Sequence, residues 1–260
     1  MKRQMWVLFV GAALVLAGCG TAGGGDTAAQ DEPDAARTKT APPTSAAPTT
    51  STGPAAPDAS RYVIGFGDLS AVSLPTGDPG VVGIVVAGET TDSGGAVNMV
   101  VRNNTSDEVG RIEVTGTARD SAGALVGSGS SQGFQPQVVA PGEIAYGYVY
   151  FDSEIPPGST FQFSVDADSV DDYFLPVTVT EINNNGSQII GAVTNENSVA
   201  VSGPISADVM CFGLDGSLID YARSYAEEDE LPAGGAGSFS IDLYGDECPI
   251  GLAAASGYGY

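Results

Sequence analysis

The chain has 260 residues and carries 32 Asp and Glu side chains against 9 Lys and Arg, a formal net charge of −23 at pH 7. This surplus of negative charge repels phosphate backbones and excludes nucleic acid as a partner. Histidine is absent from the chain, so the commonest general base and the commonest transition-metal ligand are both missing.

The amino terminus has the pattern of an export signal. Lys2 and Arg3 precede an apolar segment from Met5 to Leu16, and about 12 apolar residues are too few for the ~20 of a spanning helix. The segment closes with Leu16-Ala17-Gly18-Cys19, which resembles the bacterial lipobox. The resemblance implies a signal peptide over residues 1–18, a diacylglyceryl group on the Cys19 thiol, and further acylation (palmitate, for example) of the new amine. The alternative is an ordinary signal peptide with a chance cysteine.

Residues 19–60 are predicted to form a lipidated linker. From Gly20 to Ser60 the chain consists almost wholly of Ala, Thr, Pro, Gly, Ser and Asp, with no Val, Ile, Leu or aromatic residue. Such a segment cannot bury enough apolar surface to offset the entropy of ordering, so we expect it to be disordered. The linker would hold the remaining residues away from the lipid surface, on the extracytoplasmic face of the cell membrane.

The remaining 200 or so residues contain an internal repeat. With an offset of 92 or 93 residues, Glu89 falls on Glu181, Val97 on Ile189, and Gly123 on Gly216. Both copies show short segments of alternating apolar residues separated by turn signals, and no helical stripe. We therefore predict an all-β protein with two tandem immunoglobulin-like β-sandwich domains, over residues 61–174 and 175–260.

The second copy is similar to the FxLYD family of bacterial export-associated domains. The residues that carry the similarity are Gly191-Ala192-Val193-Thr194-Asn195, the turn Asp215-Gly216, and Phe239-Ser240-Ile241-Asp242-Leu243-Tyr244. The first copy departs from this pattern, with Met99 in place of the glycine and Tyr146 in place of the phenylalanine. The resemblance implies a location on lipoproteins or other envelope proteins and attaches no general enzymatic activity.

Two cysteines remain once Cys19 is set aside as the lipidation site, and they are Cys211 and Cys248. In an exported protein an even pair is read first as a disulfide, here one that pins the end of the chain to a central strand. A catalytic or metal-binding role would need a nearby base or further ligands, and the sequence shows neither.

Two acidic runs are candidate metal sites. Asp166, Asp168, Asp171 and Asp172 lie at the junction of the two copies, where oxygen ligands could hold Ca²⁺. The alternative is a solvated acidic linker, because the spacing lacks the glycine and terminal glutamate of an EF-hand loop. The run from Glu227 to Glu230 is either a charged loop or a site for a metal ion or a basic partner.

Neither catalysis nor a specific ligand follows from the remaining residues. Serines have no histidine partner, and no pair of carboxylates is set apart by an apolar context that would raise a pKa. Tyr146, Tyr148 and Tyr150 alternate along one strand, so they share a face that is either an aromatic binding strip or part of the core.

We therefore expect a membrane-anchored, non-enzymatic lipoprotein that acts as a structural or interaction module of the envelope. Its expected partners are the bilayer, through acylated Cys19, and another envelope protein. The alternative function is an accessory lipoprotein that binds Ca²⁺ or a small ligand. No other cofactor is predicted.

Overall fold

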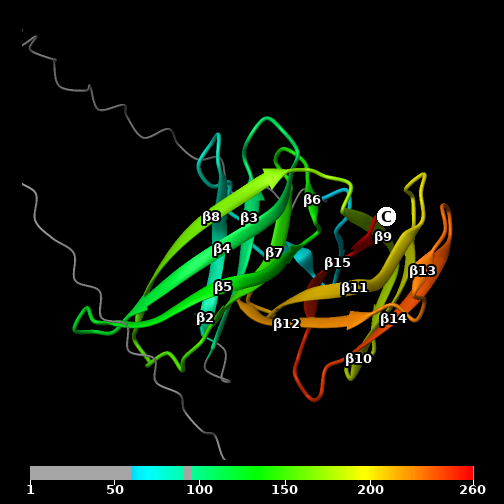
Figure 1. Cartoon of the computed structure of the whole chain (residues 1–260). Helices are drawn as coiled ribbons and strands as arrows, with labels where there is room; N and C mark the ends of the chain where they lie inside the picture. The colour runs from blue at the N-terminus through cyan, green and yellow to red at the C-terminus, as the bar shows by residue number, and fades with distance from the viewer. Residues whose placement is uncertain (1–59, 91–94, 260) are drawn as a thin grey trace, which may run out of the picture. The chain divides into compact units, whose positions relative to one another are not determined.

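The computed structural model describes residues 60–90 and 95–259, and they form an all-β protein with two sandwiches. The first sandwich is a curled sheet of seven antiparallel strands, with β8, β4, β5 and β7 side by side (Figure 1). Its strands are β2 (Val82–Thr90), β3 (Ala96–Asn103), β4 (Val109–Arg119), β5 (Leu125–Gln135), β6 (Val138–Val139), β7 (Ile144–Phe151) and β8 (Thr160–Ser169).

The second sandwich repeats this plan with seven strands of its own and adds one short strand from the start of the described chain. Its strands are β9 (Phe174–Asn184), β10 (Gln188–Thr194), β11 (Val201–Phe212), β12 (Leu218–Tyr225), β13 (Glu230–Leu231), β14 (Ala236–Asp242) and β15 (Ile250–Tyr258). The added strand is β1 (Ile64–Phe66), which pairs with β15. The predicted all-β fold with two sandwiches is therefore confirmed.

Corresponding strands of the two sandwiches have corresponding neighbours. β4 pairs with β5, β6 and β8, and its counterpart β11 pairs with β12, β13 and β15. Ala226 and Phe239 form a bridge. At the repeat offset of 92 residues they correspond to Phe134 and Gly147, which also pair with each other. Most strand pairs are thus shared by both halves of the repeat, but β5 pairs with β7 over several residues in the first sandwich, whereas β9 pairs with β15 in the second.

Each sheet curls into a sandwich because one strand changes partners along its length. β9 pairs with β15 through Phe174 to Val177 and with β10 beyond them. β5 pairs with β4 from Leu125 to Ser130 and with β7 from Gly129 to Gln135, so the two stretches overlap at Gly129 and Ser130. Alternate side chains of these strands turn inward, so each sandwich encloses its own apolar core.

A buried asparagine fixes the same corner in both sandwiches. The Asn103 side chain donates from Nδ2 to the carbonyls of Asp107, at 2.8 Å, and Val139, at 2.9 Å. The Asn195 side chain donates in the same way to Val199 and Leu231, at 2.8 Å each. Because both asparagines are fully buried, each amide satisfies one buried main-chain carbonyl, that of Val139 or Leu231, and one part-buried carbonyl.

A third apolar cluster joins the two sandwiches. It contains buried side chains from both of them and from the segment after β1. Its buried members are Val72, Leu74, Val100, Ile144, Tyr146, Met210, Phe212, Ile250, Leu252 and Ala254. The strands β3 and β11 therefore bury both of their faces, one in their own core and one in this cluster.

The segment between β1 and β2 connects the sandwiches. It begins with β1 on the sheet of the second sandwich, continues through the 3-10 turn η1 (Leu69–Ala71), and buries Val72 and Leu74 in the shared cluster. Buried Arg102 of the first sandwich then donates to the carbonyl of Pro75 at 3.3 Å. The domain boundaries 61–174 and 175–260 stay a prediction, and β1 places a strand from the first range on the sheet of the second sandwich.

The predicted disulfide between Cys211 and Cys248 is confirmed. Cys211 lies in β11, and Cys248 precedes β15. Both residues are buried in the core of the second sandwich, and the bond spans 37 residues of sequence. A closed loop of this length removes about 4 kcal/mol of chain entropy from the unfolded state.

We predict that Asn195→Ala lowers the free energy of unfolding by about 1–3 kcal/mol, because the buried carbonyl of Leu231 loses its donor. Urea denaturation followed by circular dichroism measures the change. Asn183→Ala is the matched control, since Asn183 is an exposed asparagine of β9, and its effect should stay within about 0.5 kcal/mol. Equal stability of the two variants would contradict the role given to the corner.

We predict that reduction with dithiothreitol lowers the free energy of unfolding by about 4 kcal/mol, through the entropy that the open loop gains in the unfolded state. The same denaturation experiment, run with and without reductant, measures the difference. The double variant Cys211→Ala, Cys248→Ala provides the control, because its stability should not respond to the reductant. A response of the double variant would place the effect elsewhere in the chain.

Candidate functional site

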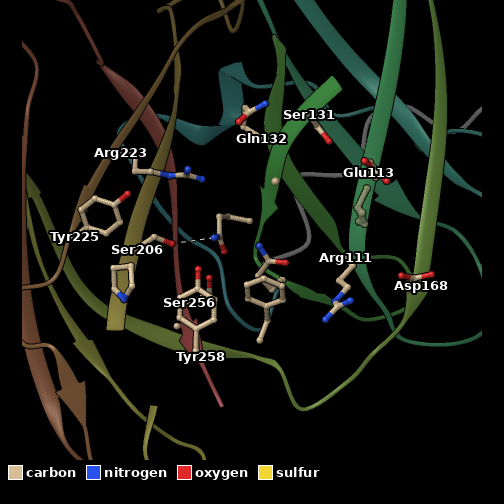
Figure 2. A pocket seen from close by; sticks show the side chains of 17 residues that line it. Arg111, Glu113, Ser131, Gln132, Asp168, Ser206, Arg223, Tyr225, Ser256 and Tyr258 are labelled. Atoms are coloured by element: carbon tan, nitrogen blue, oxygen red, sulfur yellow. Dashed lines mark hydrogen bonds between the residues drawn. The ribbon is translucent and has the colours of Figure 1, made fainter. Parts of the chain in front are cut away.

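A polar pocket of about 460 Å³ opens where β4 and β5 meet β11, β12 and β15 (Figure 2). Most of its lining side chains are neutral hydrogen-bonding groups. The lining residues are Arg111, Ile112, Glu113, Ser131, Gln132, Gly133, Gln135, Gln137 and Asp168 from the first sandwich, and Phe174, Pro204, Ser206, Arg223, Tyr225, Ser256, Gly257 and Tyr258 from the second.

The two sandwiches contribute equivalent positions to the pocket. At the repeat offset of 92 or 93 residues, four lining positions of β4 and β5 correspond to four of β11 and β12. The corresponding pairs are Arg111 with Pro204, Glu113 with Ser206, Ser131 with Arg223, and Gly133 with Tyr225. The duplicated backbone thus faces itself across the pocket while the side chains have diverged.

Irregular pairing at these positions makes room for the pocket. The register of β4 against β8 shifts between Gly110 and Glu113, and that of β11 against β15 shifts between Ser202 and Ser206. A bulge removes local ladder pairing and redirects side chains, and bulges are common beside functional sites.

Arg111 adopts a left-handed backbone conformation at the first of these irregularities, with φ of 42°. Its guanidinium forms a 3.0 Å ion pair with Asp171. It also lies 5.2 Å from the ring centroid of Tyr173 and 5.8 Å from that of Phe174. A non-glycine residue in this region is uncommon, and strain of this kind concentrates at functional sites.

A buried charge lies behind the pocket, on the side of β11 that faces the first sandwich. Asp208 is fully buried, and its Oδ1 accepts hydrogen bonds from the Tyr221 hydroxyl and from Arg223 Nε. Arg223 Nη2 donates to the Tyr221 hydroxyl at 2.7 Å. The Asp208 main-chain carbonyl accepts from the Tyr146 hydroxyl at 2.8 Å, so the group links both sandwiches.

Burial controls the protonation of this group. Desolvation raises the pKa of Asp208 above its usual value, although Arg223 and Tyr221 oppose the rise. Desolvation, reinforced by the charge of Asp208, raises the pKa of Tyr221 well above its usual value. Desolvation would lower the pKa of Arg223, but the adjacent Asp208 raises it overall. Arg223 and Tyr221 therefore stay protonated while the charge of Asp208 depends on pH.

Gln135 brings an unpartnered acceptor to the pocket lining. Its side chain is 2% exposed, and its Nε2 donates to the Ser206 hydroxyl at 3.1 Å. Its Oε1 has no hydrogen-bond partner among the described residues. A buried acceptor without a donor lowers the free energy of unfolding, and such groups are rare in folded proteins.

The four aspartates predicted as a calcium site have separate surroundings. Asp166 and Asp168 lie on β8, and Asp168 lines the pocket. Asp171 pairs with Arg111 and accepts a hydrogen bond from the Tyr173 amide at 3.0 Å. Within residues 60–90 and 95–259, no group of three or more His, Cys, Asp or Glu side chains could hold a metal ion. The calcium site, which includes Asp172, stays a prediction without a preformed cluster.

The second acidic run, Glu227 to Glu230, contains one carboxylate with a structural contact. Glu228 Oε2 accepts a hydrogen bond from the Ser238 amide at 3.0 Å. This contact ties the loop after β12 to β14, so at least one member of the run helps to shape the sheet.

The tyrosines of β7 face the other sandwich rather than their own core. Tyr146 is fully buried in the shared apolar cluster, and the rings of Tyr146 and Tyr148 pack on Tyr221 at centroid distances of 6.5 and 5.1 Å. Tyr150 is 51% exposed at the end of the strand. The expected common face exists, and the neighbouring sandwich covers most of it.

Sequence reasoning did not single out Arg111, Gln135, Asp208 or Arg223. One signal was present, because the chain has only five arginines after residue 60 and two of them line this pocket. Asp208 also interrupts an otherwise apolar run from Ala207 to Phe212. A charge at such a position needs a buried partner, but the sequence does not show which residue supplies it.

No protein-family model matches the chain, and a search of curated proteins finds no relative. The resemblance to FxLYD domains therefore stays a prediction. The signal peptide, Cys19 and the linker over residues 19–60 lie outside the described residues, apart from Ser60. Within the described part of the chain, no helix has the length and apolar character to cross a bilayer.

We predict that Arg223→Met lowers the free energy of unfolding by about 3–5 kcal/mol at about pH 7.5, because the buried Asp208 carboxylate loses its counter-ion. Removing Arg223 raises the pKa of Asp208 further, since burial then acts with less opposition. Stability gained from the protonated acid is present below the pKa of the unfolded state and lost as pH rises through the folded one. The penalty should therefore shrink toward about pH 5.

Urea denaturation of wild type and variant at both pH values measures this difference. Arg119→Met is the matched control, because Arg119 is an exposed arginine that donates to the Gly123 carbonyl. A penalty for Arg223→Met that does not change with pH would contradict the assigned coupling to Asp208.

Proposed function

We propose that the protein is a lipid-anchored, extracytoplasmic and non-enzymatic interaction module that binds another envelope protein. Three features support this proposal: the lipobox-like sequence that ends at Cys19, the cysteine pair in the oxidised state, and the linker-like composition of residues 20–60. In this proposal the two sandwiches form the binding head, and the linker sets the distance over which the head searches.

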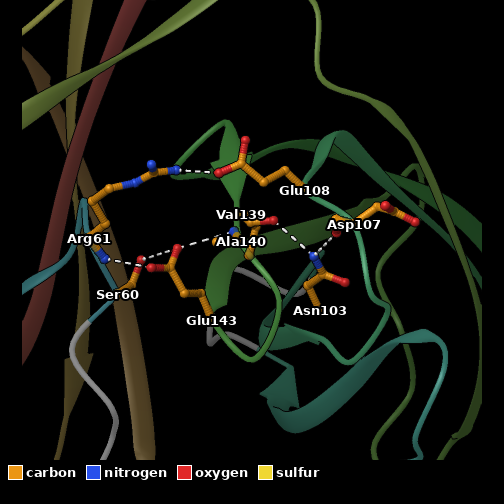
Figure 3. A network of polar contacts seen from close by, with 8 residues as sticks. All are labelled: Ser60, Arg61, Asn103, Asp107, Glu108, Val139, Ala140 and Glu143. Carbon is orange, nitrogen blue, oxygen red and sulfur yellow. Dashed lines mark hydrogen bonds and ion pairs between the residues drawn. The ribbon is translucent and has the colours of Figure 1, made fainter.

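The start of the described chain is tied to the head by polar contacts, which Figure 3 shows. The Ser60 hydroxyl and the Arg61 amide donate to Glu143 at 3.2 and 2.9 Å, and Arg61 forms a 2.6 Å ion pair with Glu108. Glu143 also accepts from the Ala140 amide at 3.1 Å. These contacts fix the point at which the proposed linker joins the first sandwich.

The observation that carries the proposal is the position of Tyr244 between β14 and β15. Its side chain is 91% exposed, and its backbone is left-handed with φ of 50°. The preceding Leu243 is 3% exposed and belongs to the core of the second sandwich. The chain thus buries Leu243 and exposes the next residue, a large aromatic, to solvent. The left-handed backbone of that residue costs the folded state about 1 kcal/mol or more of free energy.

Contact with a protein partner explains the exposed Tyr244 better than a contribution to the stability of the fold does. Tyrosine buries a large rigid surface at little entropic cost, and it is enriched among the residues that dominate binding energy. Solvent exposure of the ring brings the fold no packing gain, and the strained backbone weakens it. We therefore assign Tyr244 to the contact with the partner.

We predict that Tyr244→Gly abolishes partner binding while the free energy of unfolding stays within about 1 kcal/mol of wild type, because glycine relieves the left-handed strain. A photo-crosslinking amino acid at position 244 should yield one adduct with an envelope protein in living cells. The same amino acid at the half-exposed Tyr150 is the matched control and should not yield that adduct. Equal crosslinking from both positions, or none from position 244, would contradict the proposal.

We also predict that Cys19→Ala moves the full-length protein from the detergent phase to the aqueous phase in Triton X-114 partitioning, because the acyl chains are lost. Cys211→Ala, Cys248→Ala is the control, since it removes cysteines but retains the anchor. Retention of the Cys19 variant in the detergent phase would overturn the lipid anchor and leave the Tyr244 experiment as an independent test.

A further inference from the structure

We propose that the pocket between β4, β5, β11 and β12 binds a neutral, hydroxyl-rich ligand of the class of short oligosaccharides. This site is separate from Tyr244, and it goes beyond the proposed contact with an envelope protein. The pocket volume of about 460 Å³ falls within the ~300–1,000 Å³ that small-molecule sites occupy.

The charges around the pocket disfavour an anionic ligand. Arg111 is paired with Asp171, and Arg223 is paired with Asp208, so neither arginine brings an uncompensated positive charge. The carboxylates of Glu113 and Asp168 also line the pocket and would repel an anion. The chain as a whole has a net charge of −23, which adds to the repulsion.

The lining combines apolar surface with neutral polar groups. Its glutamine and serine side chains include Gln132, Gln137, Ser131 and Ser256. These groups both donate and accept hydrogen bonds. A ligand with many hydroxyl groups, which also donate and accept, is the complement of such a surface.

Gln135 Oε1 identifies what the ligand must supply. This acceptor has no partner among the described residues, while the Nε2 of the same side chain is already committed to Ser206. The fold fixes the amide through Ser206 and leaves its oxygen, which is buried in the pocket wall, in need of a donor. A ligand hydroxyl that displaces the atoms covering this oxygen would supply the donor, and its hydrogen bond would remove the penalty of the unpaired group.

Tyr225 provides an aromatic surface at the same pocket. It lines the pocket and is 54% exposed, and Figure 2 shows it on the same side as Arg223 and Ser206. A tyrosine ring offers an apolar face together with a polar hydroxyl. The alternating C–H and hydroxyl edges of a sugar ring match that combination.

Binding is tested with the full-length lipoprotein in a detergent that has no sugar head group. An array of neutral and uronic-acid-containing oligosaccharides identifies the probe, and titration calorimetry with that probe measures affinity. We expect neutral di- or trisaccharides to bind, Gln135→Met to weaken binding at least tenfold, and the melting temperature of this variant to equal or exceed that of wild type. The unpaired acceptor would be gone, so loss of affinity with retained stability separates binding from folding.

Gln162→Met is the matched control, because Gln162 is an exposed glutamine of β8 outside this pocket, and its affinity should equal that of wild type. If Gln135→Met fails to fold, Tyr225→Ala replaces it as a half-exposed variant that should also weaken binding at least tenfold. Binding of no neutral oligosaccharide, a preference for the acidic ones, or equal loss in the Gln162 variant would overturn the proposal. None of these outcomes bears on the crosslinking from position 244.

Discussion

The apolar cluster between the two sandwiches is the constraint on which the rest of the structure depends. A sandwich that stands alone needs one apolar face per strand, but β3 and β11 bury both faces. The face directed at the neighbour carries Val100 in β3 and Met210 and Phe212 in β11. Burial of such side chains contributes about 1.5–3 kcal/mol each, and this gain offsets the cost of placing Asp208 in the same layer.

The internal repeat explains why both sandwiches have a buried asparagine corner and an irregular strand beside the pocket. Both copies keep the buried asparagine corner, because losing the amide at Asn103 or Asn195 would strand main-chain carbonyls. Both copies also keep an irregularity near the start of the long strand, at Arg111 and at Pro204. The corner preserves the fold of each copy, whereas the side chains at the irregularity differ between the copies, Arg111 in one and Pro204 in the other. Different side chains at this position of the two copies therefore line a pocket at the interface between the sandwiches.

Much of the fold was predictable from the sequence, and the reasons for the failures are physical. Alternation along a strand shows which residues share a face, as it did for Tyr146, but not which surface covers that face. β1 has three residues, too few to show a period, so its pairing with β15 had no local signal. The disulfide was predictable from the expected export of the chain and from the number of its cysteines. The pocket was not, because Arg111 and Gln135 owe their positions to irregular pairing that apolar patterns do not encode.

The arginines of the head show how its charge is distributed. All five after residue 60 have internal partners: Arg61, Arg111 and Arg223 pair with carboxylates, and Arg102 and Arg119 donate to main-chain carbonyls. The five arginines thus form contacts within the structure, and the more numerous acidic side chains give the surface its negative charge. At physiological salt this charge acts over about 8 Å, so it keeps the head from anionic surfaces without governing contacts at closer range. The two proposed binding elements, Tyr244 and the pocket, accordingly offer mainly neutral groups at short range.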